Sequence, residues 1–190
     1  MRVILVLILV LALTTLCAQD VAAAEDGPPT LRAAQFLRVE AASEAELEDT
    51  IFQLRSQGVD TLIVRMFQNV GERRHVLAPD APVTGVYFSS KRAPVVMDLL
   101  GSVIRVARSL GMRVFAWMPT CTCDWAVTEH PEWRDYAYDP VSGVIQPIPR
   151  LDPFHPEVQA YLEELYKEVA AHEIDGILIQ DDLISRYNQG

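Results

Sequence analysis

Apolar and polar positions follow two alternating periods along the chain, and this alternation predicts repeated strand-helix-strand units. Apolar residues three and four positions apart, typical of one helical face, are each time followed by a short continuous apolar run, typical of a buried strand. Strands are expected at Thr30–Val39, Val59–Arg65, Arg113–Met118 and Gly176–Gln180. Helices are expected after Ser43, from about Pro94 and from Pro156. This order predicts an α/β fold, in which helices pack on a parallel sheet.

Local signals mark the ends of these helices. Ser43, with Glu46 three residues later, forms a capping box that opens the first helix, and Gly58 closes it. The second helix is expected to stop at Gly111. Pro156 sits in the first turn of the third helix, and His155 before it is expected to help start that helix.

Two parallel architectures fit the pattern, an open doubly wound sheet and a (β/α) TIM-type barrel. No glycine-rich phosphate loop follows the first strand, which favours the barrel. A full barrel has eight units and takes roughly 250 residues. Only about the first four β/α units are predicted here, so the expectation is a half barrel or a truncated chain. The exposed edges of such a half would be covered by a second copy, giving a homodimer, or by a second chain.

The amino-terminal segment has the features of a secretory signal peptide. Arg2 precedes the apolar run Val3–Leu13, and Ala22–Ala24 offer a small-residue cleavage site before Glu25. The run is shorter than the roughly 20 residues of a membrane-spanning helix, so no stable membrane span is expected after processing. The predicted organisation is residues 1–24 as leader and 25–190 as one domain, in an exported protein of the periplasm or the exterior. A retained anchor and a lipid on Cys17 are the alternatives, and the bulky Leu16 fits the second poorly.

Charge and metal-binding residue types narrow the function classes. The formal net charge of −10 argues against nucleic acid and anionic membranes as partners. The four histidines show no paired ligand spacing, so no metal and no other cofactor is expected. Cys121 and Cys123 would remain after cleavage as a local disulfide, as thiols, or as two packed small residues in a loop.

An adjacent acid pair, Asp181 and Asp182, directly follows the fourth predicted strand. Catalytic side chains of parallel α/β folds project from the carboxyl ends of strands. Because successive strand residues point to opposite faces, at most one of the pair is expected to aim into a cleft. Hydrolysis of a glycosidic bond needs such a proton donor and usually a second carboxylate. The alternative is that Asp182 merely caps a following helix.

Aromatic and polar residues are expected around the same rim. Trp117, Tyr87 and Trp125 could stack on sugar rings, although each could instead belong to the core. Arg65, Arg150 and Gln180 could hydrogen-bond sugar hydroxyls, and Arg150 could equally pair with Asp152 or Asp182.

Six strings of the sequence occur in an order that resembles a known family. They are Arg32–Gln35, Gly58–Thr61, Val86–Phe88, Ala116–Pro119, Arg150–Phe154 and Asp175–Asp182. Together they resemble the carboxyl-terminal glycoside hydrolase domain of PgaB-type poly-β-1,6-N-acetyl-D-glucosamine N-deacetylases and, more loosely, bacterial family-10-like glycosyl hydrolases.

The resemblance implies a (β/α) barrel that binds and cleaves partially de-N-acetylated poly-β-1,6-N-acetylglucosamine, a biofilm exopolysaccharide. It implies acid chemistry at Asp181 and Asp182, and sugar contacts at Trp117, Tyr87 and Arg150. The deacetylase domain has no counterpart in this sequence, so deacetylation is not expected. Gln180 stands where the resemblance leads us to expect a histidine. The rival hypothesis is a carbohydrate-binding protein without catalysis, or a module that needs a second chain to complete its barrel.

Overall fold

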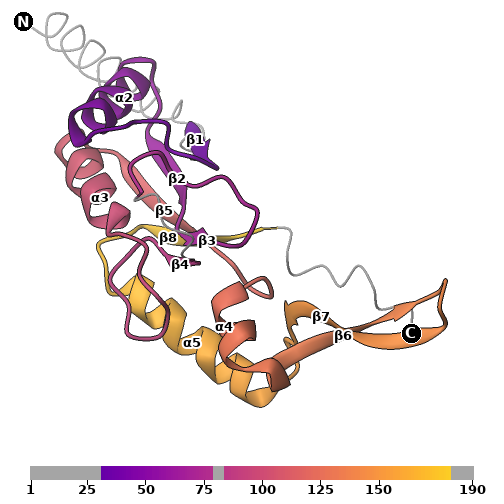
Figure 1. Cartoon of the computed structure of the whole chain (residues 1–190). Coiled ribbons are helices and arrows are strands. Elements are labelled where there is room, and N and C mark those ends of the chain that lie inside the picture. The colour runs from indigo at the N-terminus through magenta and orange to yellow at the C-terminus, as the bar shows by residue number, and fades with distance from the viewer. Residues whose placement is uncertain (1–30, 79–83, 181–190) are drawn as a thin grey trace, which may run out of the picture. The chain divides into compact units, whose positions relative to one another are not determined.

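Four parallel strands form the central sheet of the computed structural model, which describes residues 31–78 and 84–180. The strands are β1 (Ala33–Phe36), β2 (Thr61–Arg65), β5 (Arg113–Met118) and β8 (Gly176–Ile179), in the spatial order β1-β2-β5-β8 (Figure 1). The spatial order of the four strands is the same as their order along the chain. A doubly wound sheet reverses its order at a switch point, and the four described strands contain no such reversal. This is the order of consecutive units in a (β/α) barrel.

Three helices connect these strands. They are α2 (Glu44–Ser56), α3 (Leu99–Ser109) and α5 (Pro156–Ala170). The predicted capping box is confirmed, because Ser43 Oγ accepts a hydrogen bond from the Glu46 N–H at 3.2 Å. Gly58 follows the end of α2 with a φ of 89°, a left-handed conformation that a side chain would strain. His155 Nδ1 accepts from the Glu157 N–H at 3.2 Å, so His155 caps α5 as expected.

Several predicted boundaries are wrong. The first, second and fourth strands are shorter than expected, and α3 begins at Leu99 and not near Pro94. The segment before α3 instead runs beside Val86: Val95 forms a parallel bridge with it, and the Val96 N–H donates to its carbonyl at 2.9 Å. Asp98 then caps α3 through the Gly101 N–H at 3.0 Å. The backbone bonds to Val86 therefore keep Val95 and Val96 out of the helix, although the spacing of Val96 from the next apolar residues is helical.

The two long connections at the carboxyl ends of strands carry structure of their own. After β2, the short strands β3 (Phe67–Gln68) and β4 (Gly85–Val86) pair antiparallel. After β5 come helix α4 (Asp124–Glu129), a 3-10 turn at Pro131–Trp133, and a hairpin. The hairpin strands are β6 (Arg134–Asp139) and β7 (Val144–Leu151), which extend away from the sheet (Figure 1). Sequence reasoning expected only loops there.

Pairing register assigns every strand residue to one of two sheet faces. Leu62 pairs with Val114, and Val64 pairs with both Phe36 and Ala116, so these side chains share one face. This outer face belongs to a single apolar core cluster that also contains residues of α2, α3 and α5. The inner face carries the residues between them, Gln35, Ile63, Phe115, Gly176, Arg65, Trp117 and Leu178.

The predicted leader is not part of the structure that can be described. Contacts separate residues 1–31 from residues 32–190, and the leader expected at residues 1–24 lies outside the described residues. In the described part of the chain, no helix combines the length and apolar character needed to cross a membrane.

Candidate functional site

The carboxyl ends of the four parallel strands bring four residues to the inner face. The sequence predicts three of them as site residues, Arg65, Trp117 and Gln180, and the structure adds Gln35. Gln35 lies on β1, Arg65 ends β2, Trp117 lies near the end of β5, and Gln180 directly follows β8. We call these four residues the mouth. Arg65 and Trp117 are direct partners in the parallel register. Active sites of parallel α/β folds gather at this end of the strands.

A hydrogen bond spans the mouth between the two outer strands. Gln35 Nε2 donates to Gln180 Oε1 at 2.6 Å, although β1 and β8 are not neighbours in the sheet. The sheet therefore curves enough for its outermost described strands to meet across the inner face. Two amide side chains held in this way could present their remaining donors and acceptors to sugar hydroxyls.

Arg65 places a buried positive charge at the mouth. Its side chain lies 3.5 Å from Glu72 Oε2, donates to the Arg73 carbonyl, and rests 5.8 Å from the centre of the Phe67 ring. Its Nε is buried and has no hydrogen-bond partner among the described residues. A buried donor without a partner costs free energy, so this N–H could donate a hydrogen bond to a ligand oxygen.

Trp117 is the predicted aromatic that keeps a partly exposed surface at the mouth. It is half-buried, and its ring meets Phe67 edge to face at a centroid distance of 5.8 Å. The Phe67 contact fixes the orientation of the indole, and an oriented indole is suited to stacking against the apolar face of a sugar ring.

Two other aromatic residues that the sequence predicted as sugar contacts, Tyr87 and Trp125, are buried in the protein interior. Tyr87 is fully buried, and its hydroxyl donates to Gln68 Oε1 at 2.7 Å. Trp125 is also buried, and its Nε1 donates to the Tyr161 hydroxyl at 2.7 Å. Both side chains have their polar atoms satisfied inside the protein, so neither offers a stacking surface. Burial also raises the pKa values of Tyr87 and Tyr161, so both hydroxyls stay protonated.

The predicted residues that remain lie beyond the mouth or beyond the described residues. Arg150 is half-buried near the end of β7, where the following Leu151 N–H donates to the Cys121 carbonyl at 2.7 Å. This bond holds the end of β7 beside the segment that follows β5. Asp181 and Asp182 come directly after Gln180 in the sequence, and both lie outside the described residues.

A partly buried polar network in the connections after β2 and β5 was missed by sequence reasoning. Asn69 Nδ2 donates to the Thr122 carbonyl at 3.0 Å, and Asn69 Oδ1 accepts from the Asp124 N–H at 3.1 Å. The Asp124 carboxylate in turn accepts from the Val70 N–H at 2.6 Å. These bonds join the connections after β2 and β5. The signal in the sequence is the pair Gln68-Asn69, two amides placed where an apolar strand has just ended.

His75 is the titratable group at the centre of the connection after β2. It is almost completely buried; its Nδ1 accepts from the Val39 N–H at 2.8 Å, and its Nε2 lies 2.8 Å from the Arg65 carbonyl. The Nδ1 bond requires an unprotonated nitrogen, which places the proton on Nε2. Burial lowers the pKa of His75 to about 4, and the positive charges of Arg65 and Arg38 act in the same direction. His75 is therefore neutral at pH 7.

Cysteine and metal-binding groups add little to the site. Cys121 and Cys123 are buried thiols in the segment after β5. Within residues 31–78 and 84–180, no group of three or more His, Cys, Asp or Glu side chains is arranged to hold a metal ion.

Comparison with protein families gives a match over most of the chain. Residues 40–188 match GHL13, described as hypothetical glycosyl hydrolase family 13. The chain belongs to this family. A GHL13 member is glycoside hydrolase-like. Three of the four mouth residues, Arg65, Trp117 and Gln180, lie within the matched range, and Gln35 lies before it. No curated protein sequence matches the chain.

Solved structures resemble this GHL13 chain in fold. The PgaB (BpsB) glycoside hydrolase domain from Bordetella bronchiseptica is 21% identical, with a TM-score of 0.57, and the match covers 81% of this chain and 45% of that one. α-L-Fucosidase isoenzyme 2 from Paenibacillus thiaminolyticus is 16% identical, with a TM-score of 0.53, and the match covers 79% and 23%. A hypothetical protein from Ruminiclostridium thermocellum is 14% identical, with a TM-score of 0.51, and the match covers 80% and 75%.

These likenesses establish the fold class. At identities of 14–21%, a similar structure indicates a similar fold and does not indicate the substrate. The chain spans less than half the length of the Bordetella domain that it matches. The parallel α/β fold expected from the sequence is confirmed, and its solved neighbours include glycosidases.

Proposed function

We propose that this protein is an exported glycoside hydrolase that binds and cleaves partially de-N-acetylated poly-β-1,6-N-acetylglucosamine. Membership of GHL13 supports the reaction class. The PgaB-type strings of the sequence support the polymer, and the leader-like segment before Glu25 supports export. The net charge of −10 suits a polymer whose free amines are positively charged.

The observation that carries the proposal is the mouth itself. Gln35, Arg65, Trp117 and Gln180 converge from four strands on the end where glycosidases of parallel α/β folds keep their chemistry. The next two residues in the sequence after Gln180 are Asp181 and Asp182. A carboxylic acid there would protonate the leaving oxygen of the glycosidic bond.

Each mouth residue has a role in this mechanism. Trp117 stacks on the sugar at the cleavage point, while the amides of Gln35 and Gln180 orient its hydroxyls. The Arg65 Nε donates to a sugar oxygen. The second group that the reaction needs is either another carboxylate or the acetamido oxygen of the substrate, which assists in some glycosidases.

The test is hydrolysis of the polymer by the purified chain, with products resolved by mass. An Asp181→Asn, Asp182→Asn double variant should lose activity by roughly 100-fold or more, because removal of a general acid costs that much. Asp49→Asn, an exposed change on α2, is the matched control and should keep full activity. Equal activity in all three proteins would contradict the acid assignment.

A second candidate function is carbohydrate binding without hydrolysis. It is favoured by one observation: the four described mouth residues include no carboxylate. Under this hypothesis β1 and β8, the outer strands of the described sheet, would be covered by a second copy or another chain. Polymer retained on the protein without product release, together with a dimer mass in solution, would support this function over the enzyme.

A further inference from the structure

The hairpin formed by β6 and β7 leaves one of its faces open to solvent. Tyr136 lies directly opposite Pro147 in the antiparallel register. Tyr138 lies opposite Ile145, two positions away on both strands, so these four side chains share one face. Tyr136, Tyr138 and Ile145 are 62%, 54% and 68% exposed, and Pro147 is exposed as well. We call these four residues the tyrosine face. Ala137, which points to the opposite face of the hairpin, is buried.

The hairpin is anchored at the same end of the sheet as the mouth. It belongs to the connection after β5, the strand that carries Trp117, and it extends away from the sheet (Figure 1). At its base, the Leu151 N–H donates to the Cys121 carbonyl at 2.7 Å. The Asp152 N–H donates to the Trp133 carbonyl at 2.8 Å. These bonds fix the base, so the tyrosine face is held out from a rigid part of the protein.

The edges of the hairpin are poorly suited to pairing with a further strand. Pro147 and Pro149 on β7 have no N–H, and prolines in strands stand where no neighbouring strand pairs. On β6, the Asp135 carboxylate accepts the Tyr136 N–H at 2.7 Å, which occupies a donor that an added strand would need. A ligand of the hairpin would therefore contact its exposed side chains and not its backbone.

The size of the tyrosine face favours a narrow ligand over a globular one. A stable protein interface takes roughly 800 Å² from each partner. A tyrosine that becomes fully covered contributes about 150–250 Å², and both tyrosines of the face are already close to half covered. With Ile145 and Pro147 added, the face offers roughly half of the area that a globular partner requires. A linear polymer lying along a two-stranded ribbon needs no wider surface.

The exposed rings have the amphipathic chemistry that saccharides match. Neither the Tyr136 hydroxyl nor the Tyr138 hydroxyl bonds to another residue in the described part of the chain. Each ring therefore presents an apolar face together with a hydroxyl that can donate and accept. A sugar unit has the complementary pair, an apolar CH face and hydroxyl groups at its edge.

The charge of the arm suits a polymer with free amines. Between Tyr136 and Pro149, the only charged residue of the sequence is Asp139. The Ser142 hydroxyl and the Val141 N–H donate to its carboxylate and lower its pKa, so it is ionised at neutral pH. An anionic lipid surface attracts basic residues, and this stretch has none. A cationic amino sugar meets no repulsion here.

We propose that the tyrosine face is a second saccharide-binding surface, on which units of the polymer that lie outside the mouth stack. The inference rests on the proposed function for the identity of the polymer, partially de-N-acetylated poly-β-1,6-N-acetylglucosamine. It deepens that function, because it makes affinity depend on chain length: a long chain contacts both the mouth and the tyrosine face, and a disaccharide contacts only one of them at a time.

Equilibrium binding of the long polymer tests the tyrosine face, in an Asp181→Asn, Asp182→Asn background that keeps the polymer intact. Tyr136→Thr, Tyr138→Thr removes both rings and keeps residues that favour strands. This change should weaken polymer binding roughly tenfold, since two aromatic stacks are lost. Phe52→Leu, which removes an exposed aromatic ring from α2, is the matched control and should leave binding unchanged. Urea unfolding checks that all variants are folded.

A disaccharide separates the tyrosine face from the mouth. In the parent, the polymer should bind more tightly than the disaccharide, and the double tyrosine variant should lose roughly tenfold of that ratio. Trp117→Leu should weaken binding of both ligands by a similar factor, because every bound chain uses the mouth. A ratio that is the same in the parent and in the tyrosine variant would overturn the proposal.

Other occupants of the face give distinct results. A parent that is dimeric in solution and becomes monomeric in the tyrosine variant would make the face an interface between two copies. Tyrosine-dependent binding to anionic phospholipid vesicles, without polymer binding, would make it a membrane contact. Hydrolysis by the parent with unchanged polymer affinity in the tyrosine variant would overturn the tyrosine face and spare the enzyme. Tyrosine-dependent polymer binding without hydrolysis would overturn the enzyme and leave the tyrosine face.

Discussion

The two faces of the central sheet share one backbone and differ in what covers them. On the outer face, every strand residue of β2 and β5 is fully buried against the helices: Leu62, Val64, Val114, Ala116 and Met118. On the inner face, Ile63, Phe115, Trp117 and Leu178 are only half-buried. The outer face therefore supplies stability, while the inner face remains available to a ligand. Four predictions test this division, in order of decreasing effect.

Neighbouring residues on opposite faces give the largest expected contrast. Leu62→Ala removes a fully buried side chain from the core and should lower the free energy of unfolding by about 2–5 kcal/mol. Ile63→Ala, the matched change on the inner face, should cost about 1 kcal/mol, because that side chain is already partly in water. Urea unfolding of both variants measures the difference. Equal losses would mean that the inner face is as well covered as the outer one.

His75 is a titratable side chain that the connection after β2 buries, so its contribution to stability depends on pH. Its pKa of about 4 in the folded protein lies below 6.5, so the unfolded chain binds a proton more readily. The stability that neutral His75 contributes is complete above pH 6.5 and is lost as the pH falls from 6.5 towards 4, by about 2–3 kcal/mol. Unfolding of the parent and of His75→Gln from pH 7 to pH 4 measures this loss.

The variant serves as the reference because its Gln side chain does not titrate. Other groups with lowered pKa values, such as Asp60 and Asp139, are present in both proteins, so their contribution cancels in the difference. The parent should therefore lose more stability than His75→Gln over this pH range. Parallel curves would show that His75 is not held neutral by burial.

Sequence periodicity and capping signals were sufficient for the order of the parallel strands and for the starts of α2 and α5, because those signals are local. Strand β5 and the caps at Ser43 and His155 appear where they were predicted. The predicted site was less successful. Tyr87 was expected at the rim, but its N–H donates to the Met66 carbonyl at 3.0 Å, and this contact folds the connection after β2 inward.

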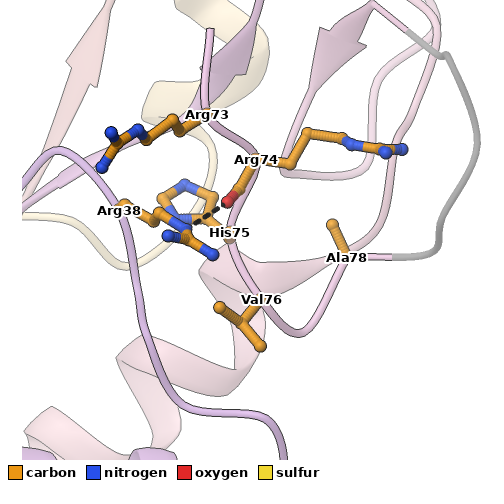
Figure 2. Close-up of a pocket in the computed structure, with 6 residues that line it drawn as sticks. All are labelled: Arg38, Arg73, Arg74, His75, Val76 and Ala78. Carbon is orange, nitrogen blue, oxygen red and sulfur yellow. Dashed lines mark hydrogen bonds between the residues drawn. The ribbon is translucent and has the colours of Figure 1, made fainter.

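Such contacts join residues about twenty positions apart or more, and no period in the sequence records them. The same holds for the Gln35–Gln180 bond. The hairpin β6–β7 pairs residues nearer in sequence, and it was missed because β7 contains prolines and because the exposed apolar residues of both strands do not alternate cleanly. The bonds from Arg38 to the Arg74 carbonyl (Figure 2) and from the Val39 N–H to His75 are further examples, since each joins residues 36 positions apart.

Gly176 tests how tightly the inner face is packed at β8. A Cβ at this position would lie 2.5 Å from Phe115 Cε1, so Gly176→Ala must displace the Phe115 ring. The expected cost is about 1–3 kcal/mol, as for overpacking of a filled site. Addition of Phe115→Leu should recover most of the loss, and a double-mutant cycle by urea unfolding measures this coupling. Additive costs would show that the ring moves freely and that the inner face is loosely packed at Gly176.

Trp117 should separate function from stability most clearly. Trp117→Leu removes a half-buried ring whose edge-to-face partner is Phe67, so the free energy of unfolding should change by about 1 kcal/mol or less. Binding of poly-N-acetylglucosamine oligosaccharides should weaken roughly fivefold to tenfold, since one aromatic stack is lost. Phe52→Leu, an exposed aromatic on α2, is the matched control and should alter neither quantity. If Trp117→Leu lowers stability by as much as Leu62→Ala while binding is unchanged, the inner face is a second core and the mouth has no saccharide to stack on.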